Sequence, residues 1–427
     1  MTEQMFGRVP LNLVVTAIKD GTHGTHARVD NGIPFLSAKN ITDSGEVSWN
    51  ETDDRISDSE YEQIHRVFQL QPRDLLLTIV GSLGRRAVFD GAKVTFQRSV
   101  AYVRPDRRRV SERFLFHWFA HGEFQRELVR RSNSTAQAGL YLGELAQTLV
   151  PDCPLTEQIK IAEVLDTLDS TIRQTQAIID KLKQVKQGLL HDLLTRGIAD
   201  NGELRPPQSE APHLYKESAL GWIPRTWKVQ PLGELAEVAR GKFTHRPRND
   251  PAFYGGQYPF IQTGDVARAA GSYVSEYSQT LSERGISVSQ EFPAGTIAIT
   301  IAANIADTAI LARPMYFPDS VVGAIVAPTE NIRFLELSIR RAKPALDARA
   351  PQSAQKNINL QDLRPLMIAV PIKNEQDAIA ERYDAVQTRL DSEERAVGKL
   401  RTLKSGLMDD LLSGRVRVTL LLLGAPA

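Results

Sequence analysis

The sequence has very little cysteine and no long apolar run. Cys153 is the single cysteine among 427 residues, so an intramolecular disulfide and a cysteine-ligated zinc site are both excluded. Apolar runs such as Leu420–Leu423 are far too short to span a bilayer. A signal peptide has a basic patch followed by an apolar stretch, and the first residues of this sequence do not show that pattern. We therefore expect a cytoplasmic protein without a membrane segment.

Charge of one sign is also scarce. The 52 Lys and Arg residues nearly balance the 51 Asp and Glu residues, which leaves a net charge of +1 at pH 7. A wholly basic surface is therefore excluded, although nucleic-acid binding needs only a local basic face. Hydrophobic residues make up 42% of the chain and charged residues 24%, as in ordinary globular proteins. A chain of this length predicts two or three domains.

Familiar catalytic signatures are missing from the sequence. Gly241 and Lys242 are followed by Phe243 and lack the upstream glycine of a phosphate-binding loop. His117 and His121 lie four residues apart but without the glutamate of the H-E-x-x-H motif, which favours packing over metal binding. No Asn- or Asp-Pro-Pro-aromatic motif of an amino-methyltransferase occurs. We therefore expect no catalytic residue, no cofactor-binding residue and no metal ligand in this chain.

The chain repeats itself at an offset of 218 residues. Glu157–Gln158 returns as Glu375–Gln376, and Gly188–Leu189 returns as Gly406–Leu407. An internal duplication of this size predicts a pseudo-two-fold molecule, which is suited to reading something that comes in two halves.

Each copy contains a long stretch in which apolar residues alternate at spacings of four and three, the pattern of a coiled-coil seam. At 1.5 Å per residue, a helix over about 155–195 would be roughly 60 Å long. The pattern leaves parallel and antiparallel packing open, and each helix could instead pack on its own domain. The predicted seam positions are Ile161, Leu165, Leu168, Ile172, Ile179, Leu182, Leu189, Leu193, Ile379, Tyr383, Val386, Leu390, Val397, Leu400, Leu407 and Leu411.

A region of about 150 residues with mixed signals precedes each helix. Strand-like runs occur over 74–80 and 100–103 and return over 295–301 and 321–326. Residues 112–131 are predicted to form one amphipathic helix, with a weaker counterpart over 333–349, and 197–212 reads as a solvated linker. The predicted fold class is α+β, with two mixed α/β domains separated by two long helices that form an intramolecular coiled coil with pseudo-two-fold symmetry.

Several segments together resemble the specificity subunit of type I restriction–modification systems. They are Gly221–Pro224 followed by Trp227, the segment Gly32–Ile41, and the two helix starts at Glu157 and Glu375. The resemblance covers nearly the whole chain, and it is the order and duplication of the segments that make it specific. The first domain departs from the pattern because it lacks the Trp-Ile-Pro lead-in of the second.

The resemblance implies an organisation and a function. Residues 1–153 and 216–371 would be target-recognition domains, 154–197 and 372–415 spacer helices, 198–215 a linker and 416–427 a tail. Each domain would read one half of a bipartite, asymmetric site on double-stranded DNA. The helices would set the spacing and dock two methyltransferase subunits. S-adenosylmethionine, ATP and magnesium would bind to the methyltransferase and restriction subunits, and this chain would have no catalysis of its own.

Base readout requires Arg or Lys for guanine, Asn or Gln for adenine, and Ser or Thr as adaptable partners. Two rival interpretations are a coiled-coil scaffold without DNA specificity and an enzyme whose motifs are unfamiliar. For the DNA-binding interpretation, the candidate residues on predicted loops are Lys19, Thr22, His23, Thr25, His26, Lys39, Arg85, Arg86 and Gln137 in the first domain, and Lys242, Thr244, His245, Arg246, Arg248, Gln262, Thr263, Asn304, Gln355, Lys356 and Asn357 in the second.

Overall fold

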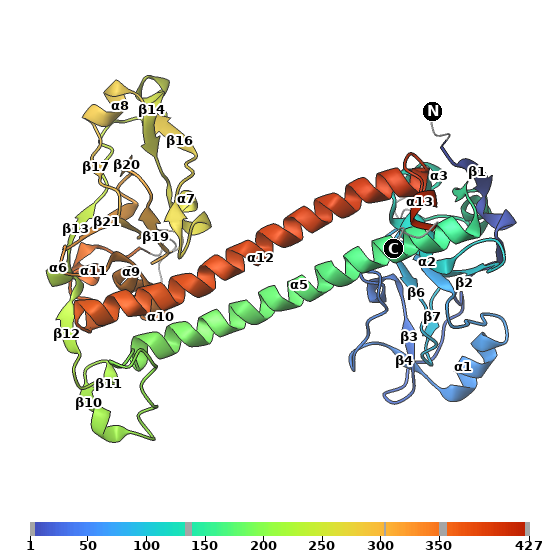
Figure 1. Cartoon of the computed structure of the whole chain (residues 1–427), viewed down its shortest axis with the longest axis horizontal. Helices are drawn as coiled ribbons and strands as arrows, with labels where there is room; N and C mark the ends of the chain where they lie inside the picture. The colour runs from blue at the N-terminus through green and yellow to red at the C-terminus, as the bar shows by residue number, and fades with distance from the viewer. Residues whose placement is uncertain (1–4, 133–138, 303–304, 350–356, 423–427) are drawn as a thin grey trace. The chain divides into compact units, whose positions relative to one another are not determined.

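The chain folds into two compact units in a computed structural model that describes residues 5–132, 139–302, 305–349 and 357–422. The first unit comprises residues 1–177 and 394–427, and the second comprises 178–393. Each unit holds one mixed domain and part of both long helices, α5 (Leu155–Thr195) and α12 (Lys373–Ser413), which appear in Figure 1 as unbroken ribbons. Among the described residues, no helix is long and apolar enough to cross a membrane.

The described residues of the first unit form three small sheets. The largest has the strand order β2-β8-β5-β6, a second has the order β4-β3-β7, and β1 pairs with β9. The strands are β1 (Gly7–Pro10), β2 (Val15–Asp20), β3 (Ile33–Leu36), β4 (Arg55–Ile56), β5 (Leu75–Thr78), β6 (Arg86–Val88), β7 (Thr95–Phe96), β8 (Val100–Pro105) and β9 (Leu149–Asp152). The helices besides α5 and α12 are α1 (Asp58–His65), α2 (Glu112–Ala120), α3 (Gly122–Arg131), α4 (Leu142–Ala146) and α13 (Thr419–Leu422), with 3-10 turns at Leu11–Leu13 and Ala38–Asn40.

The second unit repeats this topology and extends it. Its strands are β10 (Tyr215–Ser218), β11 (Gly221–Pro224), β12 (Lys228–Pro231), β13 (Ala236–Arg240), β14 (Tyr254–Phe260), β15 (Tyr273–Val274), β16 (Gln279–Leu281), β17 (Glu291–Phe292), β18 (Ile297–Thr300), β19 (Thr308–Leu311), β20 (Met315–Tyr316), β21 (Val321–Val326) and β22 (Met367–Val370). Its shorter helices are α6 (Leu232–Leu235), α7 (Thr263–Arg268), α8 (Glu283–Ser287), α9 (Ile332–Arg341), α10 (Lys343–Arg349) and α11 (Leu360–Leu363), with 3-10 turns at Pro212–Leu214 and Pro251–Phe253.

Corresponding strands take the same places in the two units. The order β13-β21-β18-β19 matches β2-β8-β5-β6, and β12 pairs with β22 as β1 pairs with β9. In both units a parallel pair, β3 with β7 and β14 with β20, stands beside an antiparallel pair. The Trp-Ile-Pro lead-in that the first domain lacks lies in β11, which pairs with β10. The predicted α+β duplication is therefore confirmed at the level of sheet topology.

The central strands are continuous apolar runs because both of their faces are covered. In β5, Leu75 and Leu77 face the core that contains Phe114 and Trp118, while Leu76 faces a second core on the other side. All four residues of β5 are buried, and so are all four residues of β18. Alternation of side chains along a strand thus joins two hydrophobic cores through one sheet.

The predicted single helix over 112–131 is wrong. The structure has two helices, α2 and α3, which meet at His121, whose backbone is extended. Its ring bonds to Asp409 at 2.9 Å and stacks on Trp118, and its Nδ1 accepts the N–H of Glu123. Gly122, a poor helix former, follows the break. The counterpart breaks at the equivalent place, Ala342, between α9 and α10.

The long helices run antiparallel within each unit, which the sequence left open. In the first unit, Ile161 and Leu165 of α5 share a core with Met408 and Leu411 of α12. In the second unit, the opposite ends of the helices meet, because residues 193–194 share a core with residues 379–383. Every predicted seam position is buried or partly buried, whereas most residues between them are exposed.

The repeated Glu-Gln pair explains how each long helix is anchored. Gln158 accepts the backbone N–H of Ser111 at 2.9 Å, and Gln376 accepts that of Asn331 at 2.8 Å. Ser111 and Asn331 are the N-caps of α2 and α9, so each glutamine ties its helix to the preceding domain.

The glutamates of the same pairs bind arginines that lie beyond the C-terminal end of the other long helix. Glu157 accepts hydrogen bonds from Arg417, which follows the end of α12. Glu375 accepts hydrogen bonds from Arg205, which follows the end of α5. Arg205 lies within the segment predicted to be a solvated linker, yet its side chain is only 11% exposed. Arg382 of α12 also donates to the carbonyl of Gly202, so this segment contacts α12 even though residues 200–203 are exposed.

Candidate nucleic-acid interface

Four of the predicted residues line one cavity in the first unit. Lys19 lies on β2, and Thr22, His23 and His26 lie on the loop that follows it. They enclose about 380 Å³ together with Gln63 of α1 and neighbouring apolar residues. Hydroxyl, imidazole and amide groups line this space together with the carboxylate of Asp20, while the Lys19 ammonium donates to the carbonyl of Val67 at 3.1 Å.

Hydrogen bonds hold the side chains of this loop in place. His26 lies between Glu60, whose carboxylate is 2.9 Å from Nδ1, and Thr22, whose hydroxyl is 2.7 Å from Nε2. The ring of His26 also meets Phe35 edge to face. His23 is more exposed and bonds to Asp20 at 2.6 Å. The loop is therefore organised before any ligand arrives.

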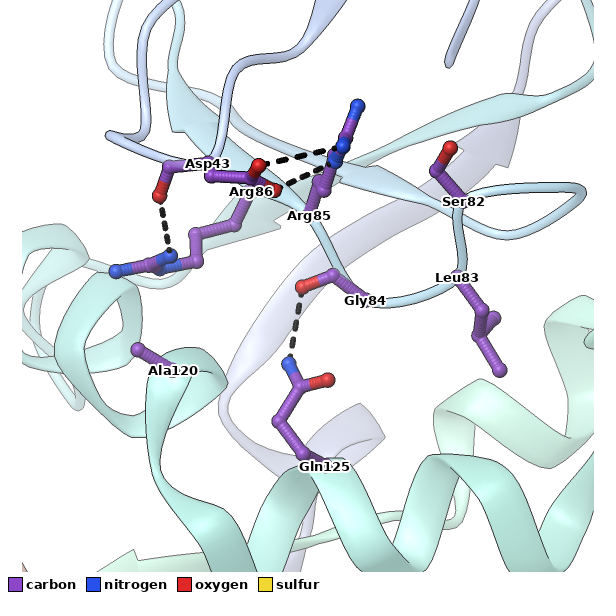
Figure 2. Close-up of a pocket in the computed structure, with 8 residues that line it drawn as sticks. All are labelled: Asp43, Ser82, Leu83, Gly84, Arg85, Arg86, Ala120 and Gln125. Carbon is purple, nitrogen blue, oxygen red and sulfur yellow. Dashed lines mark hydrogen bonds and ion pairs between the residues drawn. The ribbon is translucent and has the colours of Figure 1, made fainter. Parts of the chain in front are cut away.

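A second cavity in the first unit, of about 480 Å³, contains Arg85 and Arg86 (Figure 2). Arg85 pairs with the exposed carboxylate of Asp43 at 2.7 Å. Arg86 stacks over Phe116 and donates to its carbonyl, and burial lowers the pKa of Arg86. Gln125 of α3 closes the other side by donating to the carbonyl of Gly84 at 2.9 Å. Arg85 can exchange Asp43 for a phosphate or base, whereas Arg86 is engaged in the fold.

The corresponding face of the second unit has different chemistry. Arg248 and Gln262 line a cavity of about 350 Å³ with Asn249, Gln279 and aromatic neighbours. Arg248 forms two hydrogen bonds to Asp319, at 2.7 and 2.8 Å. Gln262 donates to the side-chain oxygen of Gln279 at 3.0 Å. Amide groups and one arginine thus take the place of the histidines and threonine of the first unit.

The remaining candidates of the first domain lie apart from these cavities. Lys39 forms an ion pair with Asp53 at 2.8 Å. Hydrogen bonds from Lys39 and Asn40 lower the pKa of Asp53 to about 2. Thr25 is exposed on its loop.

The remaining candidates of the second domain make local contacts. The Thr244 hydroxyl donates to the carbonyl of Val288, and His245 stacks on Phe253 at 3.8 Å. Arg246 donates to the carbonyls of residues 243 and 245. Lys242 lies beside this group, Thr263 begins α7, Asn357 is exposed, and Gln137, Asn304, Gln355 and Lys356 lie outside the described residues.

The structure brings to the cavities some polar residues that the sequence did not single out. Gln63 and Glu60 come from α1, Asp43 from the loop after Asn40, and Gln279 from β16. They lie outside the repeated motifs, so the duplication carried no signal for them. In the sequence, these residues could have been suspected only because they are polar and lie on short elements next to the loops that carry the motifs.

One buried group combines His117 of α2 with Asp166 and Asp169 of α5. The imidazole of His117 bonds to Asp166 at 2.7 Å, and its other nitrogen lies 3.9 Å from Asp169. Arg113 already pairs with Asp166, and Lys404 pairs with Asp169 at 2.5 Å. Because both carboxylates are neutralised by cations that a metal ion would have to face, we assign no metal to this group.

The burial of His117 predicts a pH dependence of stability. Burial lowers the pKa of His117, helped by Lys404, although Asp166 acts in the opposite direction. The unfolded chain therefore takes up this proton first, below about pH 6.5, and stability falls as the pH drops from there. Urea unfolding between pH 7.5 and 5 should show a shallower pH slope for His117→Gln than for the wild type. The exposed His191 gives the control, and an unchanged slope in His117→Gln would contradict the prediction.

Solved structures share this fold. The S subunit of the type I restriction–modification system of M. genitalium superposes with a TM-score of 0.60 at 13% identity, over 95% of this chain and 96% of that one. A chain from a structure of the type I R-M system superposes with a TM-score of 0.56 at 15% identity, over 97% and 100% of the two chains. The duplicated mixed domains with two long helices therefore define a known architecture.

Sequence relatives carry the same description. The putative type I restriction enzyme MjaX specificity subunit of Methanocaldococcus jannaschii is 22% identical over 421 residues, which is 95% of this chain and 92% of the relative. The EcoBI specificity subunit of Escherichia coli is 21% identical over 83% of this chain and 75% of its own. The model of the type I restriction modification DNA specificity domain matches residues 27–184 and 224–399. The chain belongs to this family of specificity subunits, whose role is DNA sequence recognition within a restriction–modification complex.

Proposed function

We propose that each unit reads one half of a bipartite, asymmetric DNA site. The observation that carries this proposal is the contrast between shared topology and different cavities. Thr22, His23 and His26 follow β2 in the first unit, whereas the cavity of the second unit is lined by Arg248 from the loop after β13, Gln262 after β14 and Gln279 of β16. Two copies of one scaffold that present different donors and acceptors suit two different half-sites.

The long helices serve, in this proposal, as the spacer and as the docking surface for two methyltransferase subunits. Each helix has 41 residues, or about 60 Å at 1.5 Å per residue. S-adenosylmethionine would bind to the methyltransferase subunits, and ATP and magnesium to the restriction subunits. This chain would act without catalysis, and the burial that raises the pKa of Cys153 to about 12 keeps its thiol protonated and unreactive.

Exchange of one domain tests the assignment of half-sites. Residues 1–153 are replaced by the equivalent domain of a relative, and the chain is assembled with its methyltransferase subunits. Adenine-methylation mapping should show one half of the motif changed and the other retained. The reciprocal control replaces residues 216–371 and should change only the other half. A motif in which both halves change in either chimera would contradict the proposal.

A further inference from the structure

The hydrogen bonds around His26 fix the direction in which protons are donated. An ionised carboxylate can only accept hydrogen bonds, so with Glu60 ionised the Nδ1 of His26 carries the proton. In the neutral ring, Nε2 is then an acceptor, and the hydroxyl of Thr22 must donate to it. The hydroxyl hydrogen of Thr22 is thereby used, and its oxygen can only accept: the backbone N–H of Gly24 donates to it at 3.4 Å, which leaves one lone pair for a ligand.

The backbone of Thr22 is fixed as well. Its N–H donates to the carbonyl of Phe96 at 3.1 Å, and its carbonyl accepts the N–H of Arg98 at 3.1 Å. The side chains of His26 and Glu60 are only 13% and 23% exposed, which limits their alternative rotamers. Thr22 therefore presents an oriented acceptor at the edge of the cavity that Lys19 and Gln63 also line.

A hydrogen-bond acceptor at Thr22 can distinguish bases that present an amino group from bases that present a keto oxygen. In the major groove, adenine N6 and cytosine N4 are amino donors, whereas guanine O6 and thymine O4 are acceptors. A free threonine hydroxyl can serve either kind because it both donates and accepts. We propose that the Glu60–His26 pair makes Thr22 a reader of exocyclic amino groups, so that the first unit selects adenine or cytosine at one position. This inference rests on the proposed function of the first unit as a half-site reader.

The second unit lacks this arrangement at its own Thr-His pair. The hydroxyl of Thr244 donates to the carbonyl of Val288, and His245 stacks on Phe253. Thr244 and His245 therefore provide no equivalent of the hydrogen bond between Thr22 and His26.

The experiment uses the full chain assembled with its methyltransferase subunits. Competition binding at one fixed salt concentration measures affinity for DNAs that carry each of the four bases at every position of the first half. Every base pair presents one amino and one keto group in the major groove, so the wild-type preference identifies the base that is read and the variants test the contact with Thr22. Thr22→Val, which keeps the shape but removes the hydroxyl, should lose this preference, a change of roughly tenfold.

Glu60→Gln tests the hydrogen bonds that orient the Thr22 hydroxyl, separately from the contact of Thr22 with the base. Glutamine can donate to Nδ1, which permits Nε2 to carry the proton and frees the Thr22 hydroxyl to donate to a keto oxygen. Glu60→Gln should therefore tolerate guanine or thymine at the same position while total affinity stays near that of the wild type. Thr16→Val, on exposed β2 surface, is the matched control and should leave every position unchanged.

The possible failures are distinguishable. A wild-type complex with no preference in either half would overturn the proposed function. A wild-type complex with a bipartite preference that Thr22→Val and Glu60→Gln both leave intact would overturn only the role of Thr22.

Discussion

Replacement of Glu375 by alanine is expected to lower the free energy of unfolding by roughly 3–5 kcal/mol. The side chain of Glu375 is 9% exposed and receives two hydrogen bonds from Arg205. It also accepts the indole N–H of Trp227 at 3.1 Å and the backbone N–H of Ile198 at 3.0 Å. Its removal would leave a buried arginine and two buried N–H donors without their acceptor, which is far more costly than loss of a surface ion pair.

Urea unfolding followed by tryptophan fluorescence measures this effect, since Trp227 is a direct partner. Glu157→Ala is the matched variant in the first unit and should cost less, because its partner Arg417 is 27% exposed and can turn towards solvent. Glu163→Ala removes a glutamate that is 58% exposed and should change stability by less than about 0.5 kcal/mol. A cost for Glu375→Ala no greater than that for Glu163→Ala would show that the anchoring role of Glu375 is wrong.

The long helices could be predicted because their pattern is local. Apolar residues spaced by four and three positions indicate which face of a helix is buried, and this can be read without knowing which element packs against that face. The predicted helix over about 155–195 matches α5 at both ends, and Gly197 follows it with a φ of +65°. Antiparallel packing could not be predicted, since it depends on contacts such as that of Lys404 with Asp169, 235 residues apart.

The break at His121 shows why amphipathic periodicity alone misplaced a helix boundary. The apolar pattern continues through α2 and α3, so sequence gives one helix. The partner that holds the extended backbone of His121 is Asp409, 288 residues away on α12. A tertiary contact of this kind overrides local propensity, and a local sign of the break is Gly122, a poor helix former.

The sequence predicts no cavities, although some of its candidate DNA-binding residues line them. The loop with Thr22, His23 and His26 was identified because its residue types suit base readout, and the structure gathers these side chains around one space. Glu60 could not be identified, since its link to His26 joins a helix to a loop 34 residues earlier. Arg86 shows that residue type can also suggest the wrong residue. Its basic side chain makes it a candidate for DNA contact, but that side chain is largely engaged with Phe116.

Gly21→Ala and Gly241→Ala are expected to abolish recognition of one half-site each. A Cβ at position 21 would collide with the backbone carbonyls of Phe96 and Gln97, and one at position 241 with those of Phe317 and Pro318. Backbone atoms cannot rotate away as a side chain does, so the loop that follows each glycine must shift. Such a shift costs about 1–3 kcal/mol and displaces Thr22 in one unit and the pocket residue Phe243 in the other.

Methylation mapping of the assembled complex measures both variants, and the helix glycines supply the controls. Gly188 and Gly406 are the repeated glycines of α5 and α12, and a Cβ at either would meet no atom within 4 Å. Alanine there should stabilise the helix by about 1 kcal/mol and leave both half-sites intact. Loss of the first half with Gly21→Ala, and of the second with Gly241→Ala, would establish that the two units read independently. Loss of both halves with either variant would mean that recognition in one unit depends on the other, and separate readout would have to be abandoned.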